Sequence, residues 1–464
     1  MWGLILQRHS DLSLARQIYS FIQAGIASGQ LAGGEKMPST RELATQLGVS
    51  RNTVNEAYEM LLAEGYLSSR QGAPTHVALN AAILGSIPLP VCEKKPISKA
   101  VYTYDFITGQ PDLGLFPRSK WLRHLSQASV ELPLTEYGYS GQQGLLSLRR
   151  EISHLLYRSR GLFVDPQDIF ITAGATHALH IAAKLGVFKR GIAIEDPCHS
   201  GMLQVLQKNK VQIVPIPVDE KGLQTDFLAG SKAGGIYTTP SHQFPLGGVL
   251  QADRRAALIN HARNQDAYIV EDDYDSEFRF AGEPLAPVQA LDPQRVIYIG
   301  TFSKSLFPAI RIGYAVVPLA LQHEWRQVRR HIDVQNTPFE QAALAAFLNS
   351  RDYDRHVRKM RQTYGGRRKA LLETLRGWET PWRIIGDASG IHLAIEVPGM
   401  VFTDDFVRQA AEQSIRIVPA QNHVIIAKNH QDKLLLGYGH LAEEVLRQGI
   451  TLLGKIIAKA SHRH

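Results

Sequence analysis

A cluster of polar side chains in the segment Tyr298 to Tyr314, YIGTFSKSLFPAIRIGY, could hold an anionic cofactor that carries an aldehyde. An apolar run leads into a turn that carries Lys304 among hydroxyl groups, and Arg311 follows closely. A partly desolvated lysine amine forms a Schiff base with an aldehyde, while hydroxyls and a guanidinium suit a phosphate. Pyridoxal phosphate has both groups, so we expect it to bind Lys304 covalently and to contact Thr301, Ser303 and Arg311. For this segment alone, a solvated lysine at a strand end is the alternative.

A second cluster follows the apolar run in YIVEDDYDSEF, with five acidic groups between Glu271 and Glu277. A carboxylate beneath the ring nitrogen of pyridoxal phosphate keeps that nitrogen protonated and the ring an electron sink. Asp272 is our candidate for this role, and Tyr274 could donate a hydrogen bond to the ring oxygen. A metal site is the alternative. The absence of a nearby histidine argues against transition metals, and magnesium remains open.

A third candidate is the junction in IFITAGATHALHIAAKLG, where a strand is predicted to end at Gly174 and a helix to begin at once. The backbone amides of Ala175 and Thr176 would then lie at a helix N-terminus, where unpaired N–H groups and the helix dipole favour a phosphate. We therefore expect both residues to contribute to the same phosphate site.

The elements that must position these groups alternate between strands and helices. Strands are predicted at IFITAG, GIAIED, VQIVPIPV, GGIYTTP, YIVEDD, VIYIGT and GYAVVP. Strands separated by helical stretches predict an α/β domain whose mixed, mostly parallel sheet has helices on both faces. Ligands of such sheets lie beyond the carboxyl ends of the strands, and each polar cluster above falls at such an end.

The first 78 residues predict a different structure. Ser39 and Glu42 form a capping box before one short helix, and Ser50 caps the next after a Gly-Val-Ser turn. Two helices joined in this way make a helix-turn-helix. GYLSSRQGAPTHV then predicts a two-stranded wing with a turn at Gln71 to Pro74. The exposed start of the second helix carries groups suited to DNA, namely Arg51, Asn52, Thr53 and Asn55.

The stretch PSTRELATQLGVSRNTVNEAYEMLLAEGYL resembles the winged helix of GntR-type bacterial repressors. This resemblance implies that Arg41, Arg51, Thr53 and Gly72 contact DNA. Asn55 stands where the family often has a basic residue. Because phosphate contacts supply much of the affinity for DNA, we expect weaker binding by one winged helix and a greater need for a dimer.

Composition and charge constrain the chain less than these motifs do. With 464 residues it is long enough for two or three domains. The net charge is +8, yet residues 1–80 are charge-balanced, so the high pI is weak evidence for DNA binding. The excess lies in runs such as HEWRQVRRH and RDYDRHVRKMRQTYGGRRK, which we interpret mostly as solvated helix faces.

No long apolar run and no signal peptide occur, which predicts a cytoplasmic protein without a membrane partner. The two cysteines, Cys92 and Cys198, support neither a disulfide framework nor a zinc site. We expect a winged helix-turn-helix domain at 1–78, a linker at 79–102 that mixes proline, small residues and charge, and an effector and dimerisation domain at 103–464.

A second resemblance covers about residues 105–455. ITAGATHAL, EDPCHSGMLQ, YTTPSHQFPLGG, EDDYDSEF and GTFSKSLFPAIRIGY are similar, in order and spacing, to segments of the fold type I aminotransferases. The resemblance implies the cofactor contacts proposed above, from Lys304, Asp272, Tyr274, Ala175, Thr176, Thr301, Ser303 and Arg311. Together with the winged helix, the whole chain resembles the MocR family of transcriptional regulators. That family implies operator DNA as a partner and a homodimer with winged helices swapped head-to-tail.

Two departures from the aminotransferase pattern affect the cofactor pocket. His199 follows the ED-P turn where the family has an aromatic residue, usually tyrosine, that stacks on the cofactor, and imidazole can also stack. Phe244 replaces the asparagine of the family's Asn-Pro-x-Gly turn. One hydrogen bond to the ring oxygen is thereby lost, which leaves Tyr274 and either His242 or Gln243 to compensate.

A third departure concerns the substrate. The family's Leu-Arg-Leu-Gly-Phe strand supplies an arginine that binds a substrate α-carboxylate, and the corresponding LLLGYGHL places Leu435 there. A leucine cannot bind a carboxylate. Lys433 and His440 lie nearby in the sequence, but neither has the planar fork of arginine. Ordinary transamination of amino acids is therefore not expected.

The favoured interpretation is a DNA-binding transcriptional regulator, not an enzyme, that binds pyridoxal phosphate through Lys304 and senses either pyridoxal phosphate itself or an amine. At most it would retain a slow half-reaction. One alternative is an active aminotransferase or decarboxylase with an accessory DNA-binding module. Another is a repressor whose large domain only dimerises and binds no cofactor.

Overall fold

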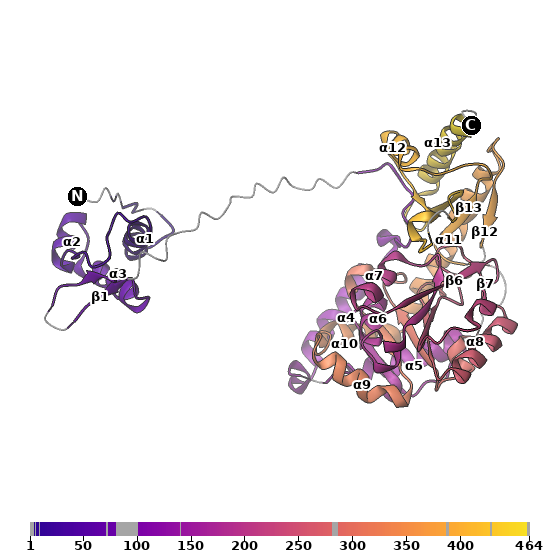
Figure 1. The fold of residues 1–464 in the computed structure, drawn as a ribbon, viewed down its shortest axis with the longest axis horizontal. Coiled ribbons are helices and arrows are strands. Elements are labelled where there is room, and N and C mark those ends of the chain that lie inside the picture. The colour runs from indigo at the N-terminus through magenta and orange to yellow at the C-terminus, as the bar shows by residue number, and fades with distance from the viewer. Residues whose placement is uncertain are drawn as a thin grey trace. The chain divides into compact units, whose positions relative to one another are not determined.

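The chain divides into two compact units, Met1–Lys99 and Ala100–His464 (Figure 1). The computed structural model describes residues 4, 6–8, 10–70, 73–79, 101–139, 141–280, 286–386, 389–426 and 429–461. Most of the predicted linker, 80–100, lies outside the described residues, so the linker and its boundaries stay a prediction.

The first unit contains three helices and a short hairpin, namely α1 (Leu14–Ala27), α2 (Thr40–Leu47), α3 (Arg51–Ala63), β1 (Leu67–Ser68) and β2 (His76–Val77). The predicted capping box is confirmed, because Ser39 Oγ accepts from the Glu42 amide at 3.2 Å and Glu42 Oε2 accepts from the Ser39 amide at 2.8 Å. Ser50 Oγ caps α3 by accepting from the Thr53 amide at 3.2 Å. The sequence therefore determines both helix starts locally.

The core of this unit is the apolar stripe of α3. Val54, Ala57 and Leu61 are buried there against Ile18 and Ile22 of α1. β1 and β2 pair antiparallel, as predicted for the wing. The turn between them includes residues 71 and 72, so Gly72, a predicted DNA contact, lies outside the described residues.

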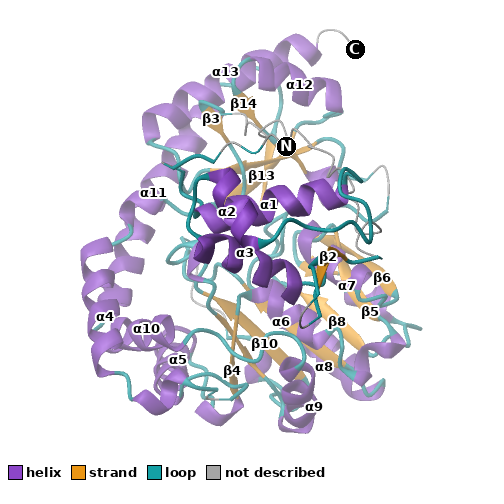
Figure 2. Cartoon of the chain, turned by 90° about the vertical axis from the view of Figure 1, so that its left-hand side faces the viewer, coloured by secondary structure: helices purple, strands orange, loops and turns teal. Residues whose placement is uncertain are grey.

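An eight-stranded sheet forms the centre of the second unit. Its strand order is β4-β11-β10-β9-β8-β5-β6-β7; β7 and β11 run antiparallel to their neighbours and the remaining pairs are parallel. Figure 2 labels β4, β10, β8, β5 and β6 of this sheet. The strands are β4 (Ile169–Thr172), β5 (Ile192–Asp196), β6 (Ile213–Asp219), β7 (Gly222–Leu223), β8 (Gly235–Thr238), β9 (Tyr268–Asp273), β10 (Val296–Thr301) and β11 (Gly313–Val316). Every strand predicted from the sequence is present.

Helices cover both faces of this sheet, as predicted. The helices are α4 (Arg118–Glu131), α5 (Leu146–Arg160), α6 (Ala175–Ala182), α7 (Ser200–Lys208), α8 (Ala252–Asn264), α9 (Leu319–Arg330) and α10 (Pro338–Asn349). In β10, Ile297 and Ile299 pack in the cluster that includes α6, α7 and α9. Tyr298 between them packs with α4, α5 and α10. Because successive strand residues point to opposite faces, both faces are apolar and the strands read as continuous hydrophobic runs.

The C-terminal part of this unit builds a smaller sheet, of which the sequence analysis indicated only the strand that carries Leu435. Its elements are α11 (Asp352–Leu375), β12 (Arg383–Ile385), β13 (His392–Glu396), α12 (Asp404–Glu412), β15 (Val418–Pro419), β16 (Lys433–Gly437) and α13 (Glu443–Ser461). The antiparallel strand order is β12-β13-β16-β15. A separate parallel pair joins β14 (Ile415–Arg416) to β3 (Tyr104–Asp105), so the start of the unit packs on its end.

The basic runs near residues 325 and 360 lie on α9 and α11, but their interpretation as solvated faces is wrong for two arginines. Arg329 is fully buried and donates to the carbonyls of Gln142, at 2.8 Å, and Ile171. Arg367 donates to the Gly439 carbonyl and to Asp112 at 2.6 Å. A buried guanidinium requires such partners, and it uses them to hold loops against the helices. Within the described residues, no helix is long and apolar enough to cross a membrane.

Candidate functional site

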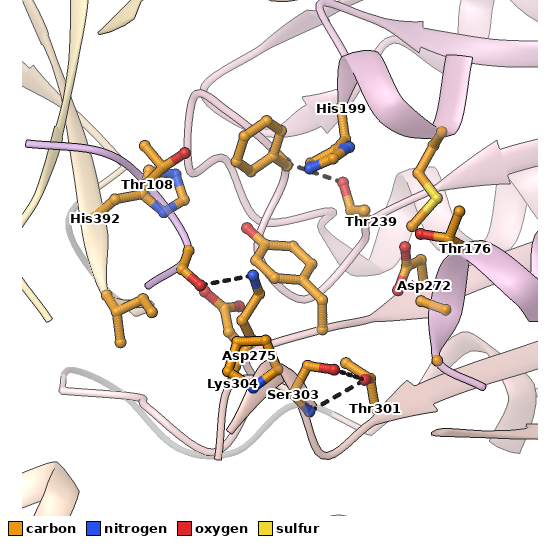
Figure 3. Close-up of a pocket in the computed structure, with 18 of the residues that line it drawn as sticks. Thr108, Thr176, His199, Thr239, Asp272, Asp275, Thr301, Ser303, Lys304 and His392 are labelled. Carbon is orange, nitrogen blue, oxygen red and sulfur yellow. Dashed lines mark hydrogen bonds between the residues drawn. The ribbon is translucent and has the colours of Figure 1, made fainter. Parts of the chain in front are cut away.

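A cavity of about 230 Å³ lies at the carboxyl ends of the central parallel strands (Figure 3). All the residues predicted to contact the cofactor line it, namely Ala175, Thr176, His199, Asp272, Tyr274, Thr301, Ser303, Lys304 and Arg311. The sequence places them on four separate segments. The sheet brings them together because parallel strands end at the same edge.

Lys304 follows β10 and points into the cavity, where its Nζ donates to the carbonyl of Gly109 at 2.7 Å (Figure 3). Burial lowers the pKa of Lys304, although the carboxylates of Asp275 and Asp272 oppose that shift. A lower pKa leaves more of the amine unprotonated and therefore nucleophilic. The side chain thus has the position and the chemistry of a group that condenses with an aldehyde.

Gly109 is a cavity residue that the sequence did not reveal. Its φ is +74°, and a Cβ at this position would lie 2.6 Å from Lys304 Nζ. Glycine is required here both by the left-handed backbone and by the space that the lysine occupies. The segment that carries it is far from Lys304 in the sequence, so no local pattern could indicate the contact.

Asp272 lies in β9 with its carboxylate buried. Oδ2 accepts a hydrogen bond from the Tyr237 hydroxyl at 2.6 Å, and no described residue donates to Oδ1, which is also buried. Burial raises the pKa of Asp272 to about 7. A buried oxygen without a donor is costly, and a protonated ring nitrogen in the cavity would supply the donor. The site therefore fits pyridoxal phosphate at this residue. The sequence analysis did not identify Tyr237, which lies within GGIYTTP, one residue before the end of β8.

The other acidic groups near Asp272 have separate partners. Asp273 binds Arg160 at 3.1 Å, and Asp275 binds His242 at 2.9 Å. The Tyr274 hydroxyl also lies 2.9 Å from His242 Nδ1. Across the described residues, no group of three or more histidine, cysteine or acidic side chains is placed to hold a metal ion. Asp272, Asp273 and Asp275 thus each interact with a different side chain and do not converge on one point.

The part of the cavity around Thr176 is suited to an anion. α6 begins directly after Gly174, whose φ is +105°, and no side chain caps the helix. A Cβ at Gly174 would lie 3.5 Å from the guanidinium nitrogens of Arg311. Thr301 Oγ1 donates to Ser303 Oγ at 3.0 Å beside them. Uncapped amides, hydroxyls and a guanidinium together form a phosphate-binding arrangement.

His199 and Phe244, which both depart from the aminotransferase pattern, lie next to each other. His199 lines the cavity, with its ring centroid 5.0 Å from that of Phe244, and its Nδ1 accepts from the Gly201 amide to cap α7. Burial lowers the pKa of His199 to about 4, so the ring is neutral near pH 7. Gln243 donates to the carbonyls of Pro197 and Phe244 and does not line the cavity.

Leu435 is fully buried in an apolar cluster and does not line the cavity. The neighbouring polar residues do not replace an arginine there. Lys433 Nζ binds Glu396 at 3.2 Å and Asp432 at 2.7 Å, away from the cavity. His440 is likewise absent from the cavity lining. Among its described lining residues, the cavity thus has no basic side chain from the strand that carries Leu435.

In the first unit, the predicted DNA contacts lie on α2 and at the start of α3. Arg41, Arg51 and Asn52 are exposed, while Thr53 and Asn55 are half-buried. Arg51 Nε donates to Thr40 Oγ1 at 3.3 Å. The Thr53 hydroxyl lies 2.8 Å from Ser50 Oγ, so it is partly used by the helix cap. Their contact with DNA stays a prediction.

Comparisons with known proteins agree with both units. Residues 14–77 match the bacterial regulatory proteins of the gntR family, and residues 109–431 match aminotransferase class I and II. A solved structure, the multiple substrate aminotransferase from Thermococcus profundus, superposes with a TM-score of 0.72 and 25% sequence identity. That superposition covers 79% of this chain and 94% of the other.

Two curated relatives match nearly the whole chain. The probable rhizopine catabolism regulatory protein MocR of Rhizobium meliloti is 33% identical, over 97% of this chain and 95% of its own. The pyridoxine biosynthesis transcriptional regulator PdxR of Corynebacterium glutamicum is 33% identical, over 96% of each chain. Both matches therefore extend through the gntR-type unit and the aminotransferase-like unit of this chain. The chain belongs to the MocR family of transcriptional regulators.

Proposed function

We propose that this regulator binds pyridoxal phosphate at Lys304 and changes its affinity for operator DNA in response to pyridoxal phosphate itself or to an amine. The observation that carries the proposal is the Asp272 carboxylate, which has one buried oxygen without a described donor in the cavity that Lys304 enters. PdxR, one of the relatives, is named as a regulator of pyridoxine biosynthesis, which is consistent with this cofactor.

When bound, pyridoxal phosphate supplies an aldehyde that condenses with primary amines and a ring that withdraws electrons. In the proposed arrangement Lys304 provides the attaching amine, and Asp272 holds a proton at the ring nitrogen. The phosphate contacts come from the amides of Ala175 and Thr176 with Thr301, Ser303 and Arg311. Tyr274 would donate to the ring oxygen, and His199 would stack on the ring. Tyr237 keeps the Asp272 carboxylate in place through its 2.6 Å hydrogen bond.

We propose that the chain does not turn over amino acids. Leu435 removes the usual carboxylate-binding arginine, and both full-length relatives cited above are named as regulators. An aminotransferase with a DNA-binding accessory is the second candidate, because the fold and the lysine site are shared with those enzymes. Steady-state production of an oxo acid from any amino donor would distinguish it, and we expect none beyond one slow half-reaction.

We further propose a homodimer, in which the winged helices are exchanged head-to-tail. Support comes from large apolar side chains left exposed on α4 and the segment after it. Val130 is 85% exposed, Leu134 82% and Tyr139 89%. Isolated exposed leucines are ordinary, but a group on one segment is typical of an interface with another protein. We expect the dimer in the cytoplasm, because a bacterial transcriptional regulator binds DNA there.

The test compares the full-length chain with Lys304→Ala. With pyridoxal phosphate present, borohydride reduction should attach the cofactor covalently to Lys304 in the wild type, as mapped by mass spectrometry, and not in the variant. Lys369→Ala, which alters a lysine whose side chain is 79% exposed on α11, is the control. Operator affinity should respond to pyridoxal phosphate in the wild type and the control only. A wild type that attaches no cofactor would refute the cofactor proposal and favour the alternative in which the large unit only dimerises.

A further inference from the structure

Leu435 lies on the face of the small sheet that is directed toward the cavity. In the β13–β16 ladder, His392 pairs with Gly437 and Ala394 pairs with Leu435. Directly paired residues, and residues two apart along a strand, point to the same face. Since His392 lines the cavity, a long side chain at 435 would extend along that face toward it. The leucine instead is buried against Leu246, and the position provides packing without charge.

No cationic side chain of the described cavity lining is left to bind a ligand carboxylate, because both have other roles in the proposed site. Among its described lining residues, Lys304 and Arg311 are the only lysine or arginine side chains. Arg311 lies beside Gly174 at the anion-binding end, and Lys304 is the attachment point of the proposed cofactor. Figure 3 shows His392 and Thr108 on one side of Lys304, with Asp272 and Thr176 on the other. The end near His392 is therefore left without a positive charge.

Apart from the Thr108 hydroxyl, the side chains described next at that end are hydrogen-bond acceptors and apolar surfaces. His392 Nε2 donates to the Pro245 carbonyl at 3.2 Å, which leaves Nδ1 as an acceptor. Burial lowers the pKa of His392 well below its usual value, so the ring stays neutral. Asp275 adds a carboxylate, and Phe244 and Ile391 add hydrocarbon. A ligand carboxylate would be buried here without a cationic partner and near another carboxylate, which is strongly unfavourable.

We propose that this cavity recognises a primary amine whose amine-bearing carbon carries no carboxylate and whose body is apolar or aromatic. The inference rests on the proposed function, because the amine reacts only if pyridoxal phosphate is held at Lys304. The ligand nitrogen takes the place of Lys304 Nζ on the cofactor's carbonyl carbon. One carbon–nitrogen double bond forms as the other breaks, and two protons pass from the ligand nitrogen to the lysine. No electrons are gained or lost, so no further reactant is needed.

The experiment uses the full-length protein loaded with pyridoxal phosphate and matched pairs of ligands that differ only by the carboxylate. The pairs are phenethylamine with both enantiomers of phenylalanine, and histamine with both enantiomers of histidine. Two quantities are measured, namely the visible absorbance of the bound cofactor and the affinity for operator DNA. We expect each amine to act at a concentration at least about tenfold lower than its amino acids, because only the amino acid buries an unpaired charge.

A variant tests the residue that carries the inference. Leu435→Arg should lower the concentration at which the amino acids act and narrow the difference within each pair, whereas Leu435→Met keeps the volume and should retain the wild-type preference. If Leu435→Arg does not fold, the ligand pairs on the wild type still decide the question. Equal responses to amine and amino acid, or a response to pyridoxal phosphate alone, would overturn the amine proposal and leave the cofactor proposal standing. A protein that cannot be loaded with the cofactor would refute both.

Discussion

Asp272 is the residue at which chemistry and burial are most closely connected. Its carboxylate has a hydrogen bond from Tyr237 on one oxygen and none from a described residue on the other. Burial raises its pKa to about 7, since the desolvated charge is costly until a donor or a cation arrives. A protonated ring nitrogen would supply the missing donor, and without it the buried charged form of Asp272 is destabilised.

Replacing this carboxylate should weaken cofactor binding. Asp272→Asn keeps the size of the side chain and removes the charge that holds a protonated ring nitrogen. We expect the dissociation constant for pyridoxal phosphate to rise about 10- to 100-fold, which corresponds to one charged hydrogen bond of roughly 1.5–3 kcal/mol. Equilibrium dialysis measures the change. Tyr237→Phe removes only the supporting hydroxyl and should have a smaller effect. If Asp272→Asn bound pyridoxal phosphate as tightly as the wild type does, the proposed role of Asp272 at the ring nitrogen would be excluded.

The same carboxyl should also affect the stability of the cofactor-free protein. The folded state keeps its proton up to about pH 7, whereas the unfolded chain releases it near pH 4. The unfolded state therefore binds fewer protons between these values, and the free energy of unfolding falls as the pH rises, by up to roughly 4 kcal/mol from this group. Asp272→Asn should show a shallower decline in urea unfolding at several pH values. The exposed Glu379→Gln control should follow the wild type, and parallel curves for Asp272→Asn and wild type would contradict the prediction.

At the scale of elements, the predictions that succeeded were local. Strands buried on both faces read as continuous apolar runs, and Ser39, Ser50 and Gly174 mark helix starts within one turn of themselves. Because parallel strands end at one edge, these runs were enough to gather Lys304 and Asp272 in one cavity.

What the sequence did not show depends on contacts between distant segments. Gly109 meets Lys304 across 195 residues, and His392 enters the cavity from a strand of the small sheet. β12 has only three residues, and β13 and β16, although five residues long like β5, lie outside the regular alternation of strands and helices from which the large sheet was predicted. Arg329 shows the same limit, because a charged residue on a basic helix is buried only when another segment supplies acceptors.

The loop after β3 should be as important for the cofactor as the lysine turn. Gly109→Ala introduces a Cβ 2.6 Å from Lys304 Nζ at a φ of +74°, so the lysine must move. We expect at least about tenfold weaker pyridoxal phosphate binding, because a misplaced reacting amine loses its alignment. Gly399→Ala, at a φ of +83° with open space around it, imposes the same backbone strain of about 1 kcal/mol without the clash. If both variants lost pyridoxal phosphate binding to a similar extent, backbone strain would explain the effect and the predicted clash with Lys304 would be contradicted.

At the scale of the whole molecule, the first unit is expected to bind DNA weakly by itself, and the second unit is proposed to strengthen that binding by forming a dimer. Residues 1–80 carry as many acidic as basic groups, so one winged helix has little net attraction to DNA phosphates. The second unit carries the exposed apolar residues of α4 and the segment after it, which we propose to form the dimer interface. Two winged helices on one dimer would bind two half-sites, and the second contact would then be intramolecular.

We therefore predict that a substitution at the proposed interface of the second unit weakens operator binding. Val130→Glu places a charge on the proposed interface, and we expect the dimer dissociation constant to rise at least about tenfold, as sedimentation will measure. Operator affinity should fall with it, while attachment of pyridoxal phosphate to Lys304 is retained. Phe227→Glu is the control, at a 59% exposed position in the segment after β7, and it should leave the dimer dissociation constant and the operator affinity unchanged.

Protein concentration separates this explanation from direct damage to the winged helix. If Val130→Glu acts only through the dimer, higher concentrations should restore both the dimer and operator binding together, because association follows mass action. Arg51→Ala removes a predicted phosphate contact without affecting the interface, so its loss of affinity should persist at every concentration and reduce the salt dependence of binding. A Val130→Glu protein that binds operator as a monomer with full affinity would show that one winged helix is sufficient despite its balanced charge.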